Sequence, residues 1–232
     1  MKRVSALPSL LLFARVPEPG RVKTRLTPRL TAPEAADLYR AFLEDASRAY
    51  LRVDRWQSVL CADPDPGDPR LAALFPEPWR RQAQSAGDLG QRLHAAFEGE
   101  FSRGAPAALA VGSDHPALER RRLEEVFDGF AGGADAVLIP AEDGGYCAIG
   151  LDARAPLGQV FRDIPWSTDV VFETTVSRLQ AAGSRVRVLA PSYDVDRPED
   201  LDRLRLDLES RDPAGEDYPA ATARAFAALT RF

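Results

Sequence analysis

Residues 10–34 read LLLFARVPEPGRVKTRLTPRLTAPE and contain an apolar run, a basic loop and a helix start. Leu10–Ala14 has the continuous apolar character of a strand that is buried on both faces. The loop that follows, residues 15–28, is rich in proline and arginine. Thr31 and Glu34 have the spacing of a capping box, so a helix is expected to begin there. The segment therefore predicts a strand–loop–helix unit of an α/β protein.

Strand and helix signals alternate along the rest of the chain. The apolar patterns predict strands at 56–62, 79–84, 107–111, 136–140, 146–151 and 186–189, and helices at 71–74, 87–101, 117–130, 167–182 and 197–208. Ser167 or Thr168 is expected to cap the fourth of these helices. This alternation predicts an α/β fold with a mostly parallel sheet that helices cover on both faces. The tight turn between 136–140 and 146–151 predicts a small antiparallel insertion.

The chain is expected to form one α/β domain over residues 1–208, followed by a tail, 209–232, that ends in a packed helix. With 232 residues, 45% hydrophobic and 28% charged, its composition is that of an ordinary globular protein. A net charge of −5 gives no general attraction to nucleic acid or to an anionic membrane. No apolar run approaches the roughly 18 residues of a membrane span, so we expect a cytoplasmic protein.

Cysteine and histidine give no metal or disulfide pattern. The spacing of a disulfide framework or of a zinc site is absent from the cysteines and histidines of the chain, which are Cys61, Cys147, His94 and His115. Among the 30 basic residues 28 are arginine, so a single arginine is a weak signal, whereas Lys23 is one of only two lysines.

Ligands of open α/β sheets bind beyond the carboxyl ends of the strands, and the first such loop is basic. It contains Arg15, Arg21, Lys23 and Arg25, without the glycine pattern of a dinucleotide site or of a P-loop. Arginine side chains pair well with phosphate oxygens, so the loop favours phosphate binding. The alternative is a solvated basic loop.

Aspartates follow two further strands at the same edge. Asp114 follows 107–111, and Asp194 and Asp196 follow the last strand. Carboxylates at these positions could share a divalent cation that bridges phosphates. The alternative is that they cap the helices that begin nearby. His115 is expected beside such a site and not as a metal ligand.

Together, these motifs resemble the nucleotide-diphospho-sugar transferase superfamily with the GT-A fold. Within it, the chain is similar to the bacterial DUF2064-type family of glycosyltransferase-like proteins, some of which are linked to arsenosugar biosynthesis. The matching segments, which span about residues 8–208, are 13–15, 19–26, 87–90, 112–116, 140–146, 164–168 and 193–201. The resemblance implies a three-layer α/β/α, Rossmann-like GT-A fold with a mostly parallel sheet.

The resemblance also implies roles for individual residues. On the donor side it implies that phosphates are contacted by Arg15, Arg21, Lys23 and Arg25, and that Lys23 is also a catalytic residue. The base and ribose of the nucleotide are expected near Gly87 and Asp88. Mg²⁺ or Mn²⁺ is expected to be held by Asp114 and Asp196. On the acceptor side it implies that the binding site for the acceptor is bordered by Glu142, Asp143, Gly144, Gly145, Trp166 and Ser167. Asp143 would act there as a catalytic base. Asp114 stands in Gly-Ser-Asp and not in a full Asp-x-Asp, so one ligand of the usual glycosyltransferase pair is missing.

Three functions are compatible with this pattern. The first is a metal-dependent glycosyltransferase that moves a sugar from a nucleotide sugar to a small-molecule acceptor. The second is a nucleotidyltransferase, in which a nucleoside triphosphate reacts with a phosphorylated or acidic substrate and pyrophosphate is released. The third is a nucleotide-binding module without turnover. The resemblance ranks the glycosyltransferase first, while the basic loop and the missing Asp-x-Asp favour the second.

Overall fold

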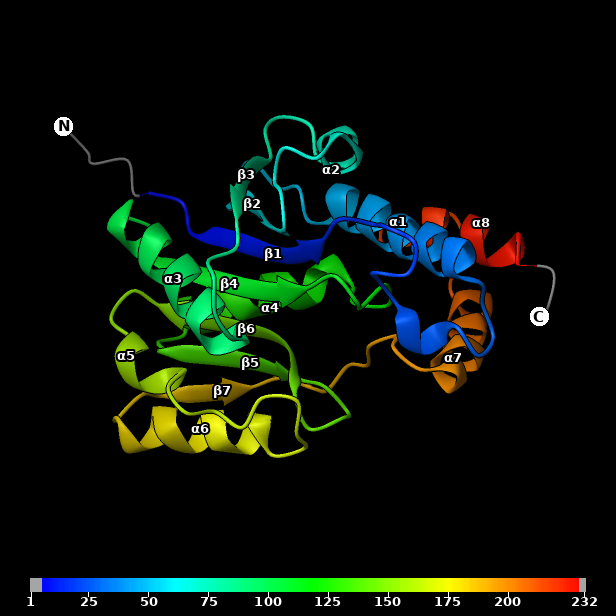
Figure 1. Ribbon diagram of the computed structural model, residues 1–232. Coiled ribbons are helices and arrows are strands. Elements are labelled where there is room, and N and C mark those ends of the chain that lie inside the picture. Colours follow the sequence, from blue (N-terminus) through cyan, green and yellow to red (C-terminus); the bar gives the residue numbers. More distant parts are fainter. Residues whose placement is uncertain (1–5, 230–232) are drawn as a thin grey trace.

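A mixed seven-stranded sheet organises the computed structural model, which describes residues 6–229 (Figure 1). Its strands are β1 (Ser9–Arg15), β2 (Gln57–Asp63), β3 (Arg80–Ala83), β4 (Ala107–Gly112), β5 (Ala136–Pro140), β6 (Tyr146–Asp152) and β7 (Val186–Val188). They lie in the order β3-β2-β1-β4-β6-β5-β7, and β6 alone runs antiparallel to its neighbours. The predicted antiparallel insertion therefore lies inside the sheet, between β4 and β5.

Helices cover both faces of this sheet, which confirms the expected three-layer α/β/α fold (Figure 1). They are α1 (Ala32–Ala49), α2 (Pro69–Leu74), α3 (Leu89–Ser102), α4 (Arg120–Ala131), α5 (Leu157–Val160), α6 (Val171–Ala181), α7 (Pro198–Ser210) and α8 (Ala220–Ala227), with a 3-10 turn, η1, at Thr24–Leu26. Side chains of α1, α4, α7 and α8 pack in one core layer, and those of α3, α5 and α6 pack in the other.

The leucine run of β1 shows why the strand needs both layers. Successive side chains of a strand point to opposite faces. Leu10 and Leu12 accordingly enter the layer formed by α1, while Leu11 enters the layer formed by α3. All three are fully buried, and each such burial contributes about 1.5–3 kcal/mol to folding. A strand of this kind has its carboxyl end at a fixed place in the centre of the sheet.

Helix α1 has the predicted capping box and also anchors the last helix. The Thr31 hydroxyl accepts from the Glu34 amide, and the Glu34 carboxylate accepts from the Thr31 amide. Further along α1, the Asp45 carboxylate accepts from the amides of Ala221 and Thr222 at 2.9 and 2.7 Å. Asp45 thus satisfies two free amides at the start of α8 and fixes that helix against α1.

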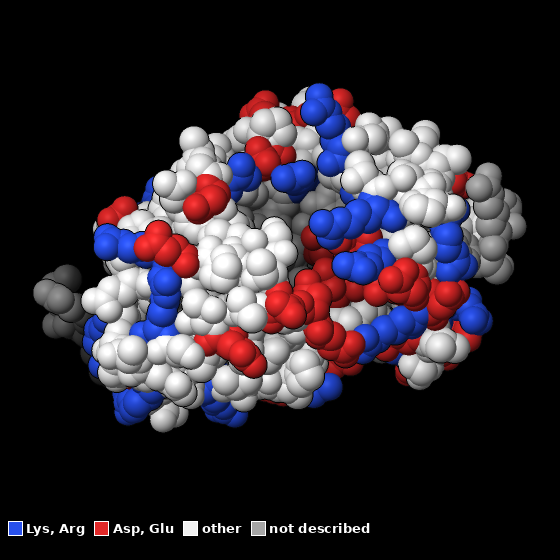
Figure 2. All heavy atoms as spheres, turned by 60° about the horizontal axis from the view of Figure 1, so that its bottom comes forward, with Lys and Arg blue, Asp and Glu red and all other residues white. Residues whose placement is uncertain are grey.

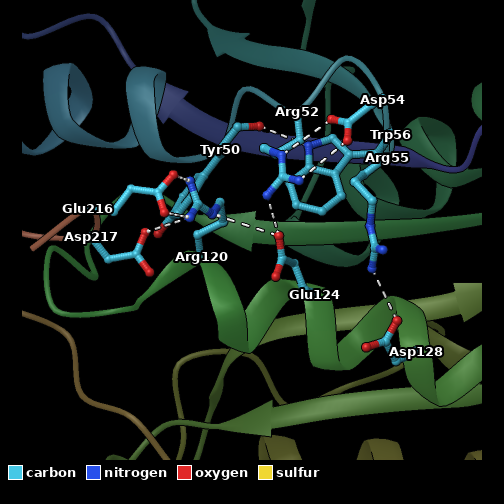
Figure 3. A network of polar contacts seen from close by, with 10 residues as sticks. All are labelled: Tyr50, Arg52, Asp54, Arg55, Trp56, Arg120, Glu124, Asp128, Glu216 and Asp217. Carbon is cyan, nitrogen blue, oxygen red and sulfur yellow. Dashed lines mark hydrogen bonds and ion pairs between the residues drawn. The ribbon is translucent and has the colours of Figure 1, made fainter.

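An ionic network holds the chain before α8 against α4 (Figure 3). Arg120 of α4 pairs with Glu216 at 2.7 Å and lies 3.8 Å from Asp217. Its Nε is also 3.7 Å from Glu124, which pairs with Arg52 from the loop before β2 at 2.5 Å. The network explains how a polar connection between α7 and α8 is held in one place.

Two predicted helices begin later than the sequence suggested. Helix α4 starts at Arg120 because the preceding residues form a turn, in which the Leu118 amide donates to the His115 carbonyl. Helix α6 starts at Val171, so the expectation that Ser167 or Thr168 caps it is wrong. Ser167 has a φ of +66°, and the Thr168 hydroxyl donates to the Pro165 carbonyl instead.

Candidate functional site

A pocket of about 690 Å³ lies beyond the carboxyl ends of β1, β3 and β4. It is lined by Arg15, Arg21, Lys23, Arg25, Gly87, Asp88, Asp114 and Asp196, together with Tyr39, Gln84, Arg92 and Ser113 among others. All the predicted donor-side residues therefore lie around one cavity. Figure 2 shows a hollow on this face with basic side chains along its upper and right rim and acidic side chains below it.

Lys23 lies at the floor of the pocket, and its ammonium group is internally bound. Its backbone has a φ of +49°, a left-handed conformation that is uncommon for a residue with a side chain. Its Nζ lies 2.5 Å from the Asp114 carboxylate and donates to the Val195 carbonyl at 2.7 Å. The side chain is 3% exposed, and the rings of Tyr39 and Phe42 lie 5.9 Å from Nζ. Lys23 therefore joins the segment after β1 to the segments after β4 and β7.

Asp114 is a charged group that points into the pocket. Burial alone would raise its pKa, but the adjacent Lys23 ammonium outweighs burial and holds the pKa of Asp114 below its ordinary value. Its side chain keeps 45% exposure. The carboxylate is thus ionised and accessible to a ligand in the pocket.

Asp196 is brought to the same pocket by the backbone. The Val195 amide donates to the Asp114 carbonyl at 2.9 Å, and His115 Nδ1 lies 3.1 Å from the Tyr193 carbonyl. These contacts fix residues 193–195 beside the turn after β4. Arg25 Nη1 then donates to Asp196 Oδ2 at 2.5 Å, across the mouth of the pocket.

Arg15 and Arg21 supply exposed positive charge at the rim. Arg15 is 64% exposed in its side chain and lies 3.7 Å from Asp63. The Arg21 side chain is exposed and makes no hydrogen bond or ion pair with any of residues 6–229. Both guanidinium groups are therefore accessible to an anionic ligand.

The opposite wall is formed by the segment between β3 and α3. Asp88 caps α3, since its carboxylate accepts from the Gln91 amide at 2.8 Å, and Gly87 has a φ of +108°. Arg92 braces this wall by donating to the Gly87 carbonyl, to Gln84 Oε1 and to the Asp63 carboxylate. These contacts connect the wall to β2 and α3, and Gly87 and Asp88 of this segment line the pocket.

Sequence reasoning missed several of the lining residues, among them Tyr39, Gln84 and Arg92. Tyr39 reads as a core residue of a helix, yet its hydroxyl accepts from the Arg15 amide at 2.9 Å and lies 2.8 Å from Ser113 Oγ. Gln84 follows an edge strand, and Arg92 is one arginine among many. Only their position in space distinguishes them, so no local pattern could have found them.

The predicted acceptor-side residues lie outside this pocket lining. Glu142 pairs with Arg203 of α7 at 2.5 and 2.7 Å, and Asp143 Oδ1 accepts from the Gly145 amide at 2.9 Å. Gly144 has a φ of +89° and packs against the backbone of Asp169, where a side chain would overlap it.

Two further features connect the acceptor-side residues to the pocket. Trp166 packs against Gly90, in the first turn of α3 behind the pocket wall, and Ser167 follows it in the chain. Burial raises the pKa of Asp194, the field of Asp143 adds to this rise, and His115 and Lys23 oppose it. Asp143 and Asp194 therefore lie within electrostatic range of each other beside the pocket floor.

A divalent cation would find two carboxylates here and no complete cage. In the part of the chain that the structure describes, no group of three or more His, Cys, Asp or Glu side chains could hold a metal ion. Mg²⁺ is commonly held by one or two carboxylates together with water and substrate phosphates. Asp114 and Asp196 have the oxygen ligands for this arrangement, so they fit a cation that arrives with a phosphate ligand.

Comparison with known families places the chain in one of them. The family described as "Uncharacterized protein conserved in bacteria (DUF2064)" matches residues 46–168, more than half of the sequence. The chain belongs to the DUF2064 family. The match includes Asp88, Asp114 and the acceptor-side residues, while the basic loop and Asp196 lie outside it.

Solved structures share the fold of this DUF2064 protein. A candidate nucleotide-diphospho-sugar transferase from Desulfovibrio desulfuricans G20 is 30% identical, with a TM-score of 0.86 over 97% of this chain and 96% of that one. A cytidylyltransferase from Leptospira borgpetersenii is 12% identical (TM-score 0.59, 97% of each chain). A CMP:2-keto-3-deoxy-manno-octonic acid synthetase complexed with CTP is 14% identical (TM-score 0.50, 87% and 98%). The fold is therefore that of nucleotide-diphospho-sugar transferases.

No curated protein sequence matches the chain. None of the helices within residues 6–229 is long and apolar enough to span a membrane.

Proposed function

We propose that this protein is a transferase that uses a nucleotide-phosphate donor, and that the donor binds in the 690 Å³ pocket. The observation that carries the proposal is that Asp114 and Asp196 line one cavity together with the accessible guanidinium groups of Arg15 and Arg21. The fold shared with a candidate nucleotide-diphospho-sugar transferase supports it. Binding of a diphosphate requires fixed positive charge, and transfer requires that the leaving phosphate be stabilised.

The residues of the donor side have distinct proposed roles. Arg15, Arg21 and Arg25 would bind phosphate oxygens, and Gly87 and Asp88 would border the base and ribose. Lys23 would act as a catalytic group by fixing the Asp114 carboxylate and by adding positive charge under the phosphates. Its own contacts to Asp114 and Val195 support the first of these two actions directly.

Mg²⁺ or Mn²⁺ would be held by Asp114 and Asp196, with phosphate and water completing its ligands. When bound, the cation would offset the charge that develops on the leaving phosphate. Arg15 and Arg21 act on the same charge from the rim. Asp143, whose second carboxylate oxygen has no partner among residues 6–229, would take the proton of the attacking acceptor hydroxyl.

Sugar transfer from a nucleotide sugar to a small acceptor is the first form of the reaction. In it the bond between the sugar and the diphosphate breaks, a bond to the acceptor oxygen forms, and a nucleoside diphosphate leaves. The 30% identity to a candidate nucleotide-diphospho-sugar transferase favours this form. Nucleotidyl transfer from a triphosphate, with pyrophosphate as leaving group, is the second form. The single aspartate of Gly112-Ser-Asp114 favours it, because an Asp-x-Asp pair is absent there.

A thermal-shift panel tests the proposal. Nucleoside diphosphates, triphosphates and nucleotide sugars are each added with and without Mn²⁺. We expect at least one to raise Tm in a Mn²⁺-dependent manner, since a ligand that binds only the folded state stabilises it. Asp114→Asn should lose the Mn²⁺-dependent part of the shift, while Asp202→Asn, which removes an aspartate outside the pocket lining, should keep it. No stabilisation by any nucleotide in the presence of Mn²⁺ would exclude the proposed donor site.

Product analysis then separates the two forms of the reaction. The stabilising donor is incubated with a mixture of small hydroxylated and phosphorylated acceptors. Release of a nucleoside diphosphate from a nucleotide sugar identifies glycosyl transfer, and release of pyrophosphate from a triphosphate identifies nucleotidyl transfer. Binding with neither product would instead indicate a nucleotide-binding module.

A further inference from the structure

Two of the three aspartates that line the pocket, Asp114 and Asp196, have counter-cations of different kinds. Asp114 faces Lys23 and Asp196 faces Arg25, each at 2.5 Å. The Lys23 side chain is 3% exposed, whereas the Arg25 side chain is 69% exposed. The positive charge of Lys23 is therefore buried in the protein, whereas that of Arg25 is exposed to solvent at the mouth of the pocket.

Lys23 is bound too firmly to leave Asp114. Its Nζ also donates to the Val195 carbonyl at 2.7 Å, and it lies among buried aromatic rings. Moving it would leave a buried carbonyl unpaired in addition to breaking the ion pair, and both losses oppose the movement. The Lys23 ammonium therefore stays beside Asp114 and balances the charge of its carboxylate.

Arg25, in contrast, can leave Asp196 at low cost. Its guanidinium group has its hydrogen bond and ion pair among residues 6–229 with Asp196 alone, and an ion pair exposed to solvent in this way contributes little to stability. A cation that binds Asp196 must displace or approach this guanidinium and is repelled by it.

We propose that Arg25 is an exchangeable counter-ion, which covers Asp196 in the absence of donor and moves to the donor phosphates when a metal–nucleotide complex binds. Arg25 then opposes binding of the metal alone and favours binding of metal and phosphate together. Such a residue produces positive coupling between the two ligands. This inference rests on the proposed donor site and adds to it that the metal and the nucleotide bind there cooperatively.

A neighbouring ion pair provides a matched control. Arg29 pairs with Asp202 at 2.8 Å and donates to the Pro198 carbonyl, so it connects the same two segments as Arg25 and Asp196. Neither Arg29 nor Asp202 lines the pocket. Arg29→Gln removes the same charge from the same loop without exposing a pocket carboxylate.

Mn²⁺ titration followed by electron paramagnetic resonance tests the proposal on folded, nucleotide-free protein. Arg25→Gln should bind Mn²⁺ about tenfold more tightly than the original protein, because the competing charge beside Asp196 is gone. Arg29→Gln should stay within about twofold, the change expected from one distant charge. The double variant Arg25→Gln/Asp196→Asn should lose the gain. Circular dichroism confirms that each variant is folded.

The outcomes separate this inference from the proposed function. Equal Mn²⁺ affinity of Arg25→Gln and the original protein would overturn the inference, even if a nucleotide raises Tm. An equal gain in Arg29→Gln would also overturn it, since the effect would then be one of net charge. Failure of every nucleotide to stabilise the original protein would instead overturn the donor site itself.

Discussion

The two halves of the sheet use their loop residues in different ways. At the carboxyl ends of β1 and β4, the side chains of Arg15, Arg21 and Asp114 line a common cavity. After β5, Glu142 is paired with Arg203, and one oxygen of Asp143 is hydrogen-bonded within its own turn. The first half therefore has ligand-accessible groups around an open space, while the second half is held mainly by contacts within the protein.

In addition to the pairing of β4 with β6, the loops of the two halves are connected under the pocket. This loop connection is made by the Val195 amide on the Asp114 carbonyl, His115 beside the Tyr193 carbonyl, and the Lys23 ammonium between Asp114 and Val195. These contacts place Asp196 with the first half, although it follows β7. The donor site is thus completed by one segment from the other half, and breaking this connection should have the largest effect.

Lys23→Met is the strongest test of this connection. It leaves the Asp114 carboxylate and the Val195 carbonyl without their buried partner, so we expect a loss of about 3 kcal/mol in the free energy of unfolding, measured by urea denaturation. The 45% exposure of Asp114 keeps the loss at the lower end for a broken buried pair. Lys23→Met/Asp114→Asn should recover part of it. A loss in the double variant as large as in the single one would show that the unpaired charge of Asp114 is not the cause of the loss.

A pair of glycines compares the two halves directly. Gly144, in the turn after β5, has a φ of +89°, and a Cβ there would overlap the Asp169 backbone. Gly20, in the loop after β1, has a φ of +75°, and a Cβ there would meet no atom within 4 Å. Gly144→Ala should therefore cost about 3 kcal/mol, from strain and overlap together, and Gly20→Ala only about 1 kcal/mol.

Urea unfolding of both glycine variants checks this difference. Similar losses in the two would mean that the turn after β5 can relax as readily as the loop after β1. A larger loss at Gly20 would reverse the comparison between a tightly packed half and an open one.

The same difference explains how far the sequence could predict the molecule. The strands were predictable because runs such as Leu10–Ala14 must be buried whatever surrounds them. The gathering of the predicted donor-side residues around one pocket was predictable because charged residues directly after such strands lie at the carboxyl edge of the sheet. The start of α6 was not, since the contact of Gly144 with the Asp169 backbone, far away in sequence, shapes the preceding turn.

The hydrogen-bond and ion-pair partners of side chains could not be predicted from the sequence for a related reason. Lys23 was expected at the phosphates, and nothing near it in the chain indicates that its ammonium contacts Asp114 and Val195. The bracing of the pocket wall by Arg92 depends in the same way on tertiary contacts. Residue type and position along the strands predict the location of a site, whereas its internal contacts require the structure.

The smallest expected effect is a pH dependence of opposite sign at Asp114 and Asp194. The pKa of Asp114 lies below its ordinary value of about 3.9, so its ionised form stabilises the fold above about pH 4 and this stability is lost as pH falls. Burial raises the pKa of Asp194, so its stabilising form is the protonated one, which is lost as pH rises. At neutral pH, Asp114→Asn should therefore lower the free energy of unfolding and Asp194→Asn should raise it. Urea unfolding between about pH 3 and about pH 8 should show both differences shrinking toward acid, where both aspartates are protonated. If both variants changed the free energy of unfolding with the same sign, the ionised form of Asp194 would be stabilised by its surroundings as that of Asp114 is. The two aspartates, one from each half of the sheet, would then not differ in their electrostatic environment.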